Sequence, residues 1–302
     1  MSTLSIIILN WNAAEDTIRC VQQIQNWQRV SPQIFVVDNA SSDNSADRIA
    51  QTCSAIHLIR NRANLGFAGG NNRAITASLA AGDAPLLLLN NDAFIDEEAV
   101  LQLLETLHSA SQIGIVGPLL YNAEQREQLL SAGGKTPLHH HTHIGALKPG
   151  VRTQTVDYIP GTVILIKVEV FQQAGLLDED YFFSTEVVDF CLRARRHGYR
   201  SVVDGQARAF HNLSRSSEFR TTLHTYYIIR NRFLYIRKFH PTTKLLLDGI
   251  WAFYSLLLAA KTRWIEKSPA TAKAVLLGVK DGLRGRFGGR NDEVLAQCRI
   301  TP

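Results

Sequence analysis

The stretch "LSIIILNWN", residues 4–12, decides the fold. It begins as an uninterrupted apolar run, which is typical of a strand buried on both faces, and it stops abruptly in polar residues. Three more apolar runs follow, at residues 33–39, 56–60 and 85–92, and segments of helical periodicity alternate with them. This alternation predicts an α/β fold with a mostly parallel central sheet flanked by helices.

The charge is divided unevenly along the 302 residues. Residues 1–204 hold 15 Lys and Arg against 21 Asp and Glu, whereas residues 205–302 hold 17 against 6. A basic final third suits an anionic membrane, a phosphate-bearing substrate or nucleic acid. The four cysteines lack CxxC spacing, so we expect free thiols in a reducing compartment. The first residues lack the basic start of a signal peptide.

Polar residues follow each of the four predicted strands, where the apolar run stops. Asn12, Asp38, Asn64 and Asp92 lie in these four segments. Ligands of open α/β sheets bind outside the carboxyl ends of the strands, so we expect these side chains to converge on one crevice. Each of them alone could be a turn or capping residue, but four at equivalent positions indicate a binding site.

Several longer motifs occur together, in a fixed order between residues 4 and 237. They are "IIILNWN", "IFVVDNASSDNS", "NRANLGFAGGNNRAI", "LLLLNNDAFID", "SAGG", "GLLDEDYFF" with "DFCLRARRHGY", and "FHNLSRSS". In this combination the chain resembles family-two inverting glycosyltransferases of the GT-A fold, in particular the rhamnosyltransferase-like branch that builds bacterial surface polysaccharides. The resemblance implies transfer of rhamnose or another hexose from a nucleotide-diphosphate sugar to a growing polysaccharide or a polyprenyl-linked acceptor.

The resemblance also implies a domain organisation. A GT-A catalytic domain would span residues 1–240, with a nucleotide-sugar-binding half at 1–110 and an acceptor-side half at 111–240. Residues 241–302 would form a basic helical C-terminal extension, because long apolar segments with helical character fill the last third.

Functional residues follow from the same resemblance, position by position. Asp92 matches the family's metal-binding carboxylate, and His211 matches a late histidine that completes the metal shell or touches the diphosphate; a structural role for His211 is equally open. A hard oxygen ligand suits Mg²⁺ or Mn²⁺, which offset the charge of the leaving diphosphate. The residues that the resemblance implies for nucleotide-sugar binding are Asn10, Asn12, Asp38, Asn64, Gly66, Phe67, Asn72 and Asn91.

The stretch "STEVVDF", residues 184–190, departs from the family pattern. Relatives have Glu-Asp at the start of this helix, whereas this chain has Glu186 followed by Val187. Three interpretations stay open: Glu186 is the base that activates the acceptor, Asp189 takes over that role, or the chain binds its donor and transfers slowly or not at all. We favour Glu186, because Asp189 is also placed to pair with Arg193 four residues on. The third interpretation would make the chain a nucleotide-sugar-binding or assembly protein.

Two further segments invite competing interpretations. The run "HHHTH", residues 139–143, is flanked by prolines and is expected to be a solvated or acceptor-facing loop rather than a metal site. Residues 245–260 are apolar but short of the roughly 20 residues that cross a bilayer, and they contain Asp248. They form either a buried helix or an interfacial helix with Trp251, Tyr254 and Trp264 as anchors.

These patterns predict a cytoplasmic enzyme with peripheral contact at the inner face of the cell membrane. No recognised nucleic-acid-binding module accompanies the basic residues, so we expect no nucleic-acid partner.

Overall fold

The computed structural model describes residues 2–138, 142–212 and 218–299, and contacts divide the chain into two compact units. Unit 1 comprises Met1–Leu177 and Val187–Leu213; unit 2 comprises Asp178–Glu186 and Ser214–Pro302. By contacts, unit 2 therefore joins a short segment from the middle of the chain to the last third. Whether residues 1–240 act as one functional domain stays a prediction.

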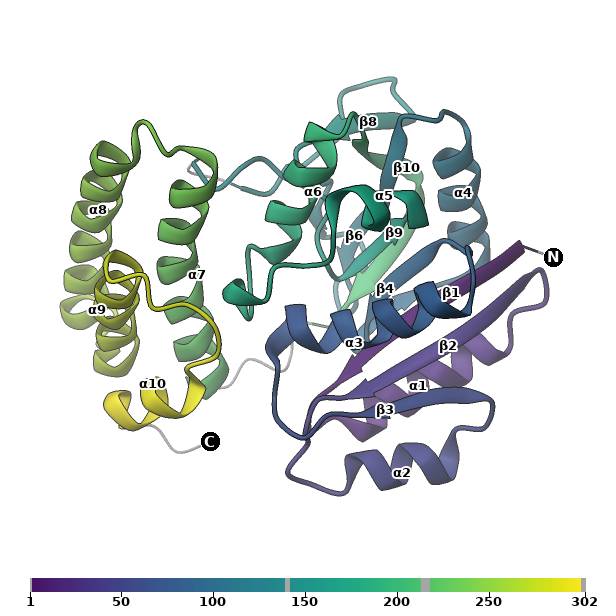
Figure 1. Cartoon of the computed structure of the whole chain (residues 1–302), viewed down its shortest axis with the longest axis horizontal. Helices are drawn as coiled ribbons and strands as arrows, with labels where there is room; N and C mark the ends of the chain where they lie inside the picture. Colours follow the sequence, from purple (N-terminus) through teal and green to yellow (C-terminus); the bar gives the residue numbers. More distant parts are fainter. Residues whose placement is uncertain (1, 139–141, 213–217, 300–302) are drawn as a thin grey trace. The chain divides into compact units, whose positions relative to one another are not determined.

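Unit 1 is built on one mixed sheet with the strand order β3-β2-β1-β4-β9-β6-β10-β5 (Figure 1). The first four strands in this order are parallel to one another, as the apolar runs predict. Strand β9 runs antiparallel between β4 and β6, and β7 and β8 pair at the side with β6 and β10. The strands are β1 Ser2–Asn10, β2 Val30–Asp38, β3 Ile56–Arg60, β4 Leu86–Asn90, β5 Ala93–Ile95, β6 Ile113–Asn122, β7 Leu129–Ser131, β8 Thr153–Val156, β9 Val163–Ile166 and β10 Arg200–His211.

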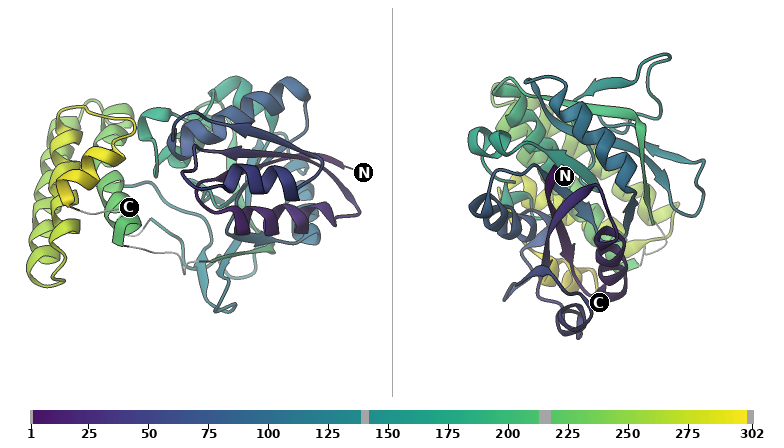
Figure 2. Two further views of the ribbon diagram at one scale, coloured as in Figure 1. Left: turned by 90° about the horizontal axis from the view of Figure 1, so that it is seen from below. Right: turned by 90° about the vertical axis from the view of Figure 1, so that its right-hand side faces the viewer.

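Helices cover both faces of this sheet. Helices α1 and α3 lie on opposite faces (Figures 1 and 2), because alternate residues of β1 point to opposite sides. Ile6 and Ile8 pack with α1, α2 and α4 in one continuous core, whereas Leu9 faces α3. The helices of unit 1 are α1 Ala14–Gln25, α2 Ser45–Thr52, α3 Gly66–Ala81, α4 Glu97–His108, α5 Val168–Ala174 and α6 Glu186–Arg196, whose first residue belongs to unit 2.

Unit 2 is helical, as the sequence of the last third predicts. Gly278 and Gly282 of α9 let this helix approach α7 closely: a Cβ at Gly282 would lie 2.3 Å from the ring of Phe233, and one at Gly278 would lie 3.0 Å from Ile229. Tyr226, Tyr227 and Leu277 belong to the core between these helices. The elements are η1 Glu179–Tyr181, α7 Glu218–Phe239, α8 Lys244–Trp264, α9 Pro269–Leu283 and α10 Asn291–Cys298.

Candidate active site

The carboxyl ends of the parallel strands meet at one edge of the sheet, as predicted. Asn10 is paired in register with Asp38, and Leu9 with Asn90, so β1, β2 and β4 end at the same level. The polar residues that follow each strand are therefore neighbours in space. We call this edge the strand-end site; it lies entirely within unit 1.

A chain of buried and partly buried hydrogen bonds connects three of these strand ends. Asn10 Nδ2 donates to Asp38 Oδ1 at 2.8 Å, and Asn10 Oδ1 accepts from Thr17 Oγ1 at 2.8 Å. Asn91 Nδ2 in turn donates to Thr17 Oγ1 at 2.9 Å. Thr17 lies on α1 and is fully buried, as is Asn10. Asn10 thus fixes Asp38 and Asn91, and both ends of its own side chain are already bonded.

Asp38 is held in a tight turn directly after β2. Its Oδ1 accepts from Ser41 Oγ at 2.6 Å, and its Oδ2 accepts from the backbone N–H of Ser41 at 3.1 Å. Asn12 connects the neighbouring loop, because its Oδ1 accepts from Ser42 N at 2.8 Å. Asn12 itself is exposed and has a left-handed backbone, with φ at 51°. Asn12 is thus a predicted donor-binding residue whose side chain is exposed to solvent.

Asn39 is the residue of this edge that our sequence analysis missed. It is buried, and its amide donates to Asn64 Oδ1 at 2.9 Å and to the carbonyl of Gly66 at 3.0 Å. Its oxygen accepts from Asn61 Nδ2 and from Leu65 N, both at 3.0 Å. One side chain therefore fixes the whole segment that leads from β3 into α3. The sequence does show Asn39 as a polar residue directly after Asp38, at the end of the apolar run.

Two glycines at the start of α3 allow a left-handed backbone conformation and a close approach to the sheet. Gly66 has a φ of 71°, a conformation that side chains disfavour, and its N–H donates to Asn64 Oδ1 at 2.8 Å. Gly70 lies against β1, where a Cβ would come within 2.5 Å of Leu9. Phe67 is half-buried in the first turn. Asn72 lies further along the helix, buried, with its amide bonded to both backbone groups of Leu177. These contacts give Asn72 a structural task.

Asp92 and His211 come together across two antiparallel strands. Strand β5 pairs with the end of β10, so that Ala93 faces His211, and the N–H of Asn212 donates to the carbonyl of Asp92 at 3.1 Å. His211 Nε2 lies 3.2 Å from Asp92 Oδ1. Both side chains are about four-fifths buried. The two predicted metal ligands are thus adjacent, although they are 119 residues apart in the chain.

The chemistry of this pair fits a divalent cation. Asp92 Oδ1 is buried, and within the described residues no donor makes a geometrically acceptable hydrogen bond to it despite the nearby imidazole. Two ligands bound to one Mg²⁺ at about 2.1 Å and at right angles lie about 3 Å apart, close to the observed separation. No third His, Cys, Asp or Glu joins them in the part of the chain described. Mg²⁺ commonly takes its remaining ligands from water and substrate phosphates, so a two-residue site is adequate for it.

Val187, which replaces the expected aspartate, is buried beside the start of α3. A Cβ added to Gly161 would lie 2.9 Å from Val187 Cγ2 and 3.2 Å from the Phe67 ring. The valine thus fills an apolar place next to a predicted donor-binding residue. Asp189 is also buried, and its Oδ2 accepts from Arg193 Nε at 2.6 Å. The predicted ion pair with Arg193 is confirmed, and it leaves Asp189 poorly placed to accept a proton from an acceptor.

Glu186 is buried at the first residue of α6, after an unusual backbone segment in unit 2. Phe182, Ser184 and Thr185 have φ values of 61°, 70° and 78°, all in the left-handed region. Such conformations cost of order 1–3 kcal/mol each and persist only where the surroundings hold them. The strain is therefore concentrated in the four residues before Glu186.

Two neighbouring side chains of α7 hold this segment. Asn231 Nδ2 lies within hydrogen-bonding distance of three carbonyls: 3.0 Å from Tyr181 O, 2.8 Å from Phe183 O and 2.7 Å from Ser184 O. Arg230 Nη2 donates to Tyr181 O at 2.8 Å. Both side chains are fully buried. We call residues 182–185 the strained loop; it owes its shape to α7.

The histidine run gives no metal site among the described residues. His139, His140 and His141 lie outside the described residues. His143 is placed, with Nδ1 3.4 Å from Ser131 Oγ and its ring edge-on to Tyr158. In the described part of the chain, no group of three potential ligands surrounds it.

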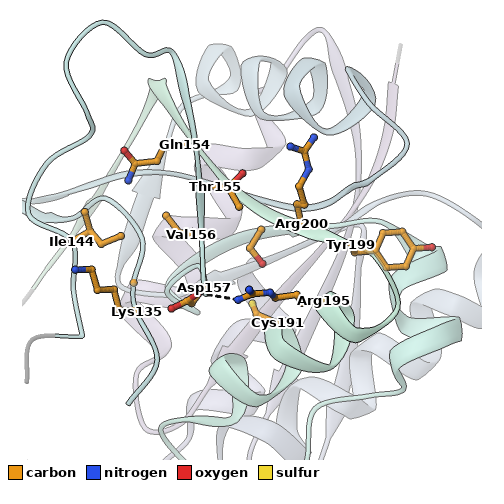
Figure 3. A pocket seen from close by; sticks show the side chains of 12 residues that line it. Lys135, Ile144, Gln154, Thr155, Val156, Asp157, Cys191, Arg195, Tyr199 and Arg200 are labelled. Atoms are coloured by element: carbon orange, nitrogen blue, oxygen red, sulfur yellow. Dashed lines mark hydrogen bonds and ion pairs between the residues drawn. The ribbon is translucent and has the colours of Figure 1, made fainter. Parts of the chain in front are cut away.

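A pocket of about 580 Å³ lies elsewhere in unit 1 (Figure 3). It is lined by β8 and by the start of β10, and Arg195 pairs with Asp157 at 3.2 Å across it. His211 lies at the opposite end of β10, so this pocket is not the strand-end site. None of the predicted site residues lines it. The lining residues are Gly134, Lys135, Ile144, Gln154, Thr155, Val156, Asp157, Cys191, Arg195, Tyr199, Arg200 and Ser201.

Comparison with known proteins identifies the family. Residues 5–175 match the family described as Glycosyl transferase family 2. Low-salt glycan biosynthesis hexosyltransferase Agl10 of Haloferax volcanii is 31% identical, over 95% of this chain and 93% of its own. dTDP-rhamnosyl transferase RfbF of Shigella flexneri is 24% identical, over 85% of this chain and 88% of its own.

A solved structure supports the fold. Mannosyltransferase PcManGT from Pyrobaculum calidifontis, in complex with GDP-Man and Mn²⁺, aligns with a TM-score of 0.60 at 12% identity, over 94% of this chain and 87% of that one. The predicted GT-A-type fold, a mixed sheet flanked by helices with helices at the C-terminus, is confirmed. Together with the family match, this shows that the chain belongs to glycosyl transferase family 2 and is a glycosyltransferase that takes its sugar from a nucleotide sugar.

Proposed function

We propose that this enzyme transfers rhamnose or another hexose, with inversion, from a nucleotide-diphosphate sugar to a growing polysaccharide or a lipid-linked glycan. The observation that carries the proposal is the Asp92–His211 pair at the strand-end site, where a buried carboxylate oxygen lacks a donor within the described residues. The relatives Agl10 and RfbF are named as a hexosyltransferase and a dTDP-rhamnosyl transferase, which favours a hexose donor.

The residues divide the work of the reaction. Asp92 and His211 would hold Mg²⁺ or Mn²⁺, which, when bound, neutralises the charge that develops on the leaving diphosphate. Asp38, fixed by Asn10 and Ser41, would receive the donor base, and Asn12 and the first turn of α3 would line the nucleotide. Asn10 acts on this site through Asp38, whereas Asn72 holds the backbone of Leu177.

Glu186 is the base of the proposed mechanism. The acceptor hydroxyl oxygen forms a bond to the anomeric carbon of the donor while the bond from that carbon to the diphosphate oxygen breaks. The hydroxyl proton passes to the Glu186 carboxylate, and the nucleoside diphosphate leaves. Two observations support Glu186 over Asp189: it begins α6 after the strained loop, and Asp189 is already paired with Arg193.

A donor panel tests the proposed substrate class. Ligands that bind only the folded state stabilise it by about 2.7 kcal/mol at 100 times their Kd. We expect dTDP-rhamnose or a GDP- or UDP-hexose to raise the melting temperature in the presence of Mn²⁺, and the same donor to do so weakly in Asp92→Asn. A panel in which no nucleotide sugar shifts the melting temperature would contradict the proposal.

The second candidate function is a nucleotide-sugar-binding protein without transferase activity. The burial of Val187 at the place of the expected aspartate favours it. Glu186→Gln separates the two: we expect unchanged donor binding with product formation reduced about 10²–10⁴-fold. If the natural chain binds its donor but neither transfers nor hydrolyses it, the binding protein is the better description.

We also propose that the enzyme works in the cytoplasm. Its four cysteines are all free and buried in the structure, which is compatible with a reducing compartment. Selective permeabilisation of the producing cell, followed by protease digestion, tests this location.

A further inference from the structure

Helix α8 of unit 2 turns its polar residues toward the protein. The buried residues Asp248, Trp251, Ser255, Ala259 and Thr262 recur every three or four positions and so form one side of the helix. Two of these residues have partners in the protein: Trp251 Nε1 donates to Ile229 O at 3.0 Å, and Asp248 Oδ2 pairs with Lys244. The side that faces the protein is therefore unusually polar for a packed helix.

The opposite side of α8 is apolar and exposed. Leu246, Ile250, Phe253 and Leu257 follow one another at intervals of four, three and four residues. Leu246 is 66% exposed, Phe253 65% and Leu257 56%. We call these four residues the outer stripe. A helix beside water carries the reverse pattern, because exposing large apolar side chains forgoes the free energy of burying them.

Length and composition agree with this inverted pattern. In the described part of the chain, α8 is the one helix long and apolar enough to cross a membrane, and only 28% of its most apolar window is buried. Single exposed apolar residues are common, whereas a contiguous stripe marks an interaction site. The outer stripe is therefore a candidate interaction surface.

The surroundings of the stripe are basic. Residues 241–290 contain nine Lys and Arg and three Asp and Glu. Two of the three acidic residues, Asp248 and Asp281, are buried and paired inside the unit. On α9, which packs beside α8 (Figure 1), Lys273, Leu276, Lys280 and Leu283 are all exposed along one side. Such alternation of cations and leucines suits the headgroup region of an anionic bilayer.

We propose that the outer stripe of α8 inserts into one leaflet of an anionic phospholipid bilayer and holds the enzyme at the membrane surface. The helix lies in the plane of the interface rather than across it. If α8 crossed the bilayer, the helices packed on it would carry charges such as Arg232 and Lys280 into the hydrocarbon, which is costly. Docking does not depend on sugar transfer, so the two proposals fail separately.

A second copy of the chain is the competing occupant of the stripe. Two such faces would bring two strongly basic surfaces together, and like charges oppose this pairing, whereas anionic lipid favours docking. Charge complementarity therefore selects the bilayer.

Vesicle sedimentation of the full-length protein tests the proposal. The double variant Leu246→Glu/Leu257→Glu removes the stripe, and Leu138→Glu/Val151→Glu makes the same charge change at residues of unit 1 that are 42% and 41% exposed. We expect the stripe variant to bind phosphatidylglycerol-containing vesicles about 100-fold more weakly, from the loss of two inserted leucines. The control variant and the natural protein should bind alike, more weakly at high salt and on neutral vesicles. Circular dichroism confirms that both variants are folded.

The orientation is tested with introduced thiols. All four natural cysteines are buried, so Lys244→Cys and Lys261→Cys can be labelled selectively. For a helix lying in the interface, both positions react with an impermeant reagent outside the vesicles; protection of one end alone would overturn the orientation. Equal binding by both double variants would overturn the docking site. A dimer that Leu246→Glu/Leu257→Glu dissociates, with no vesicle binding by the natural protein, would assign the stripe to a second copy instead.

Discussion

At the scale of single residues, the proposed chemistry depends most on Asp92. Its Oδ1 is buried without a donor of acceptable geometry in the described residues, so replacing it with an amide breaks no hydrogen bond that folding needs. We expect Asp92→Asn to keep its fold, to lose about 10²–10³-fold in kcat/KM, and to need more Mn²⁺ for half-maximal activity. A Mn²⁺ titration of initial rates measures this. Asp83→Asn, an exposed position, is the control, and equal metal requirements in the two variants would contradict the assignment.

Asn39 offers a prediction of opposite character, because its effect is on stability. Its amide donates to Asn64 Oδ1 and to the Gly66 carbonyl. Asn39→Asp places a carboxylate oxygen against two acceptors in a buried site, which we expect to cost about 2–4 kcal/mol of unfolding free energy. Donor affinity should fall as well, since this network holds the start of α3. Urea denaturation measures the stability, with exposed Asn44→Asp as the matched variant; similar losses in both would show that the network contributes nothing.

At the scale of elements, helix α7 determines the shape of the strained loop. Asn231→Leu keeps the branched shape of the side chain and removes the donor that faces the carbonyls of Tyr181, Phe183 and Ser184. Carbonyls left without partners should let the left-handed residues relax. We expect kcat to fall about tenfold or more with little change in donor Kd, because the loop leads to Glu186 and not to the strand-end site.

The control for this variant lies on the same helix. Thr221→Leu introduces the same residue at an exposed position of α7 and should leave kcat unchanged. If Asn231→Leu also retains the natural kcat, the loop does not position the base. Restoration of activity by Asn231→Gln, whose amide can still donate, would support positioning over a general loss of packing.

Local patterns predicted the parallel half of the sheet and its polar edge. Four apolar runs with polar ends are enough to align Asn10, Asp38 and Asn90, because parallel strands share one carboxyl edge. The antiparallel insertion of β9 and the strained loop were not predicted. Each depends on partners distant in the chain, such as Asn231 for residues 182–185. The outer stripe was visible as apolar composition, but only packing revealed which side of α8 faces outward.

At the scale of the whole molecule, the buried thiols make the free energy of unfolding fall as the pH becomes alkaline. Burial raises the pKa of Cys191 to about 11, and burial also raises the pKa of Cys20, Cys53 and Cys298. An unfolded thiol has a pKa of about 8.5, so above that pH the unfolded chain releases protons that the folded chain keeps. The contribution of each thiol is therefore complete below pH 8.5 and is lost as the pH rises toward the folded pKa.

We expect the free energy of unfolding to fall between pH 7.5 and 9.5, with Cys191 alone accounting for about 1 kcal/mol. Urea denaturation at the two pH values measures the difference. Cys191→Ala should lower the free energy of unfolding at both pH values, because it leaves a cavity. The difference between the two pH values should nevertheless be smaller by about 1 kcal/mol, because the thiol is gone. In the natural protein, none of the four thiols should react with a thiol reagent before unfolding, since all are buried. An unchanged pH dependence in Cys191→Ala, or reaction of Cys191 in the folded protein at pH 7.5, would show that this thiol is not protected by the fold.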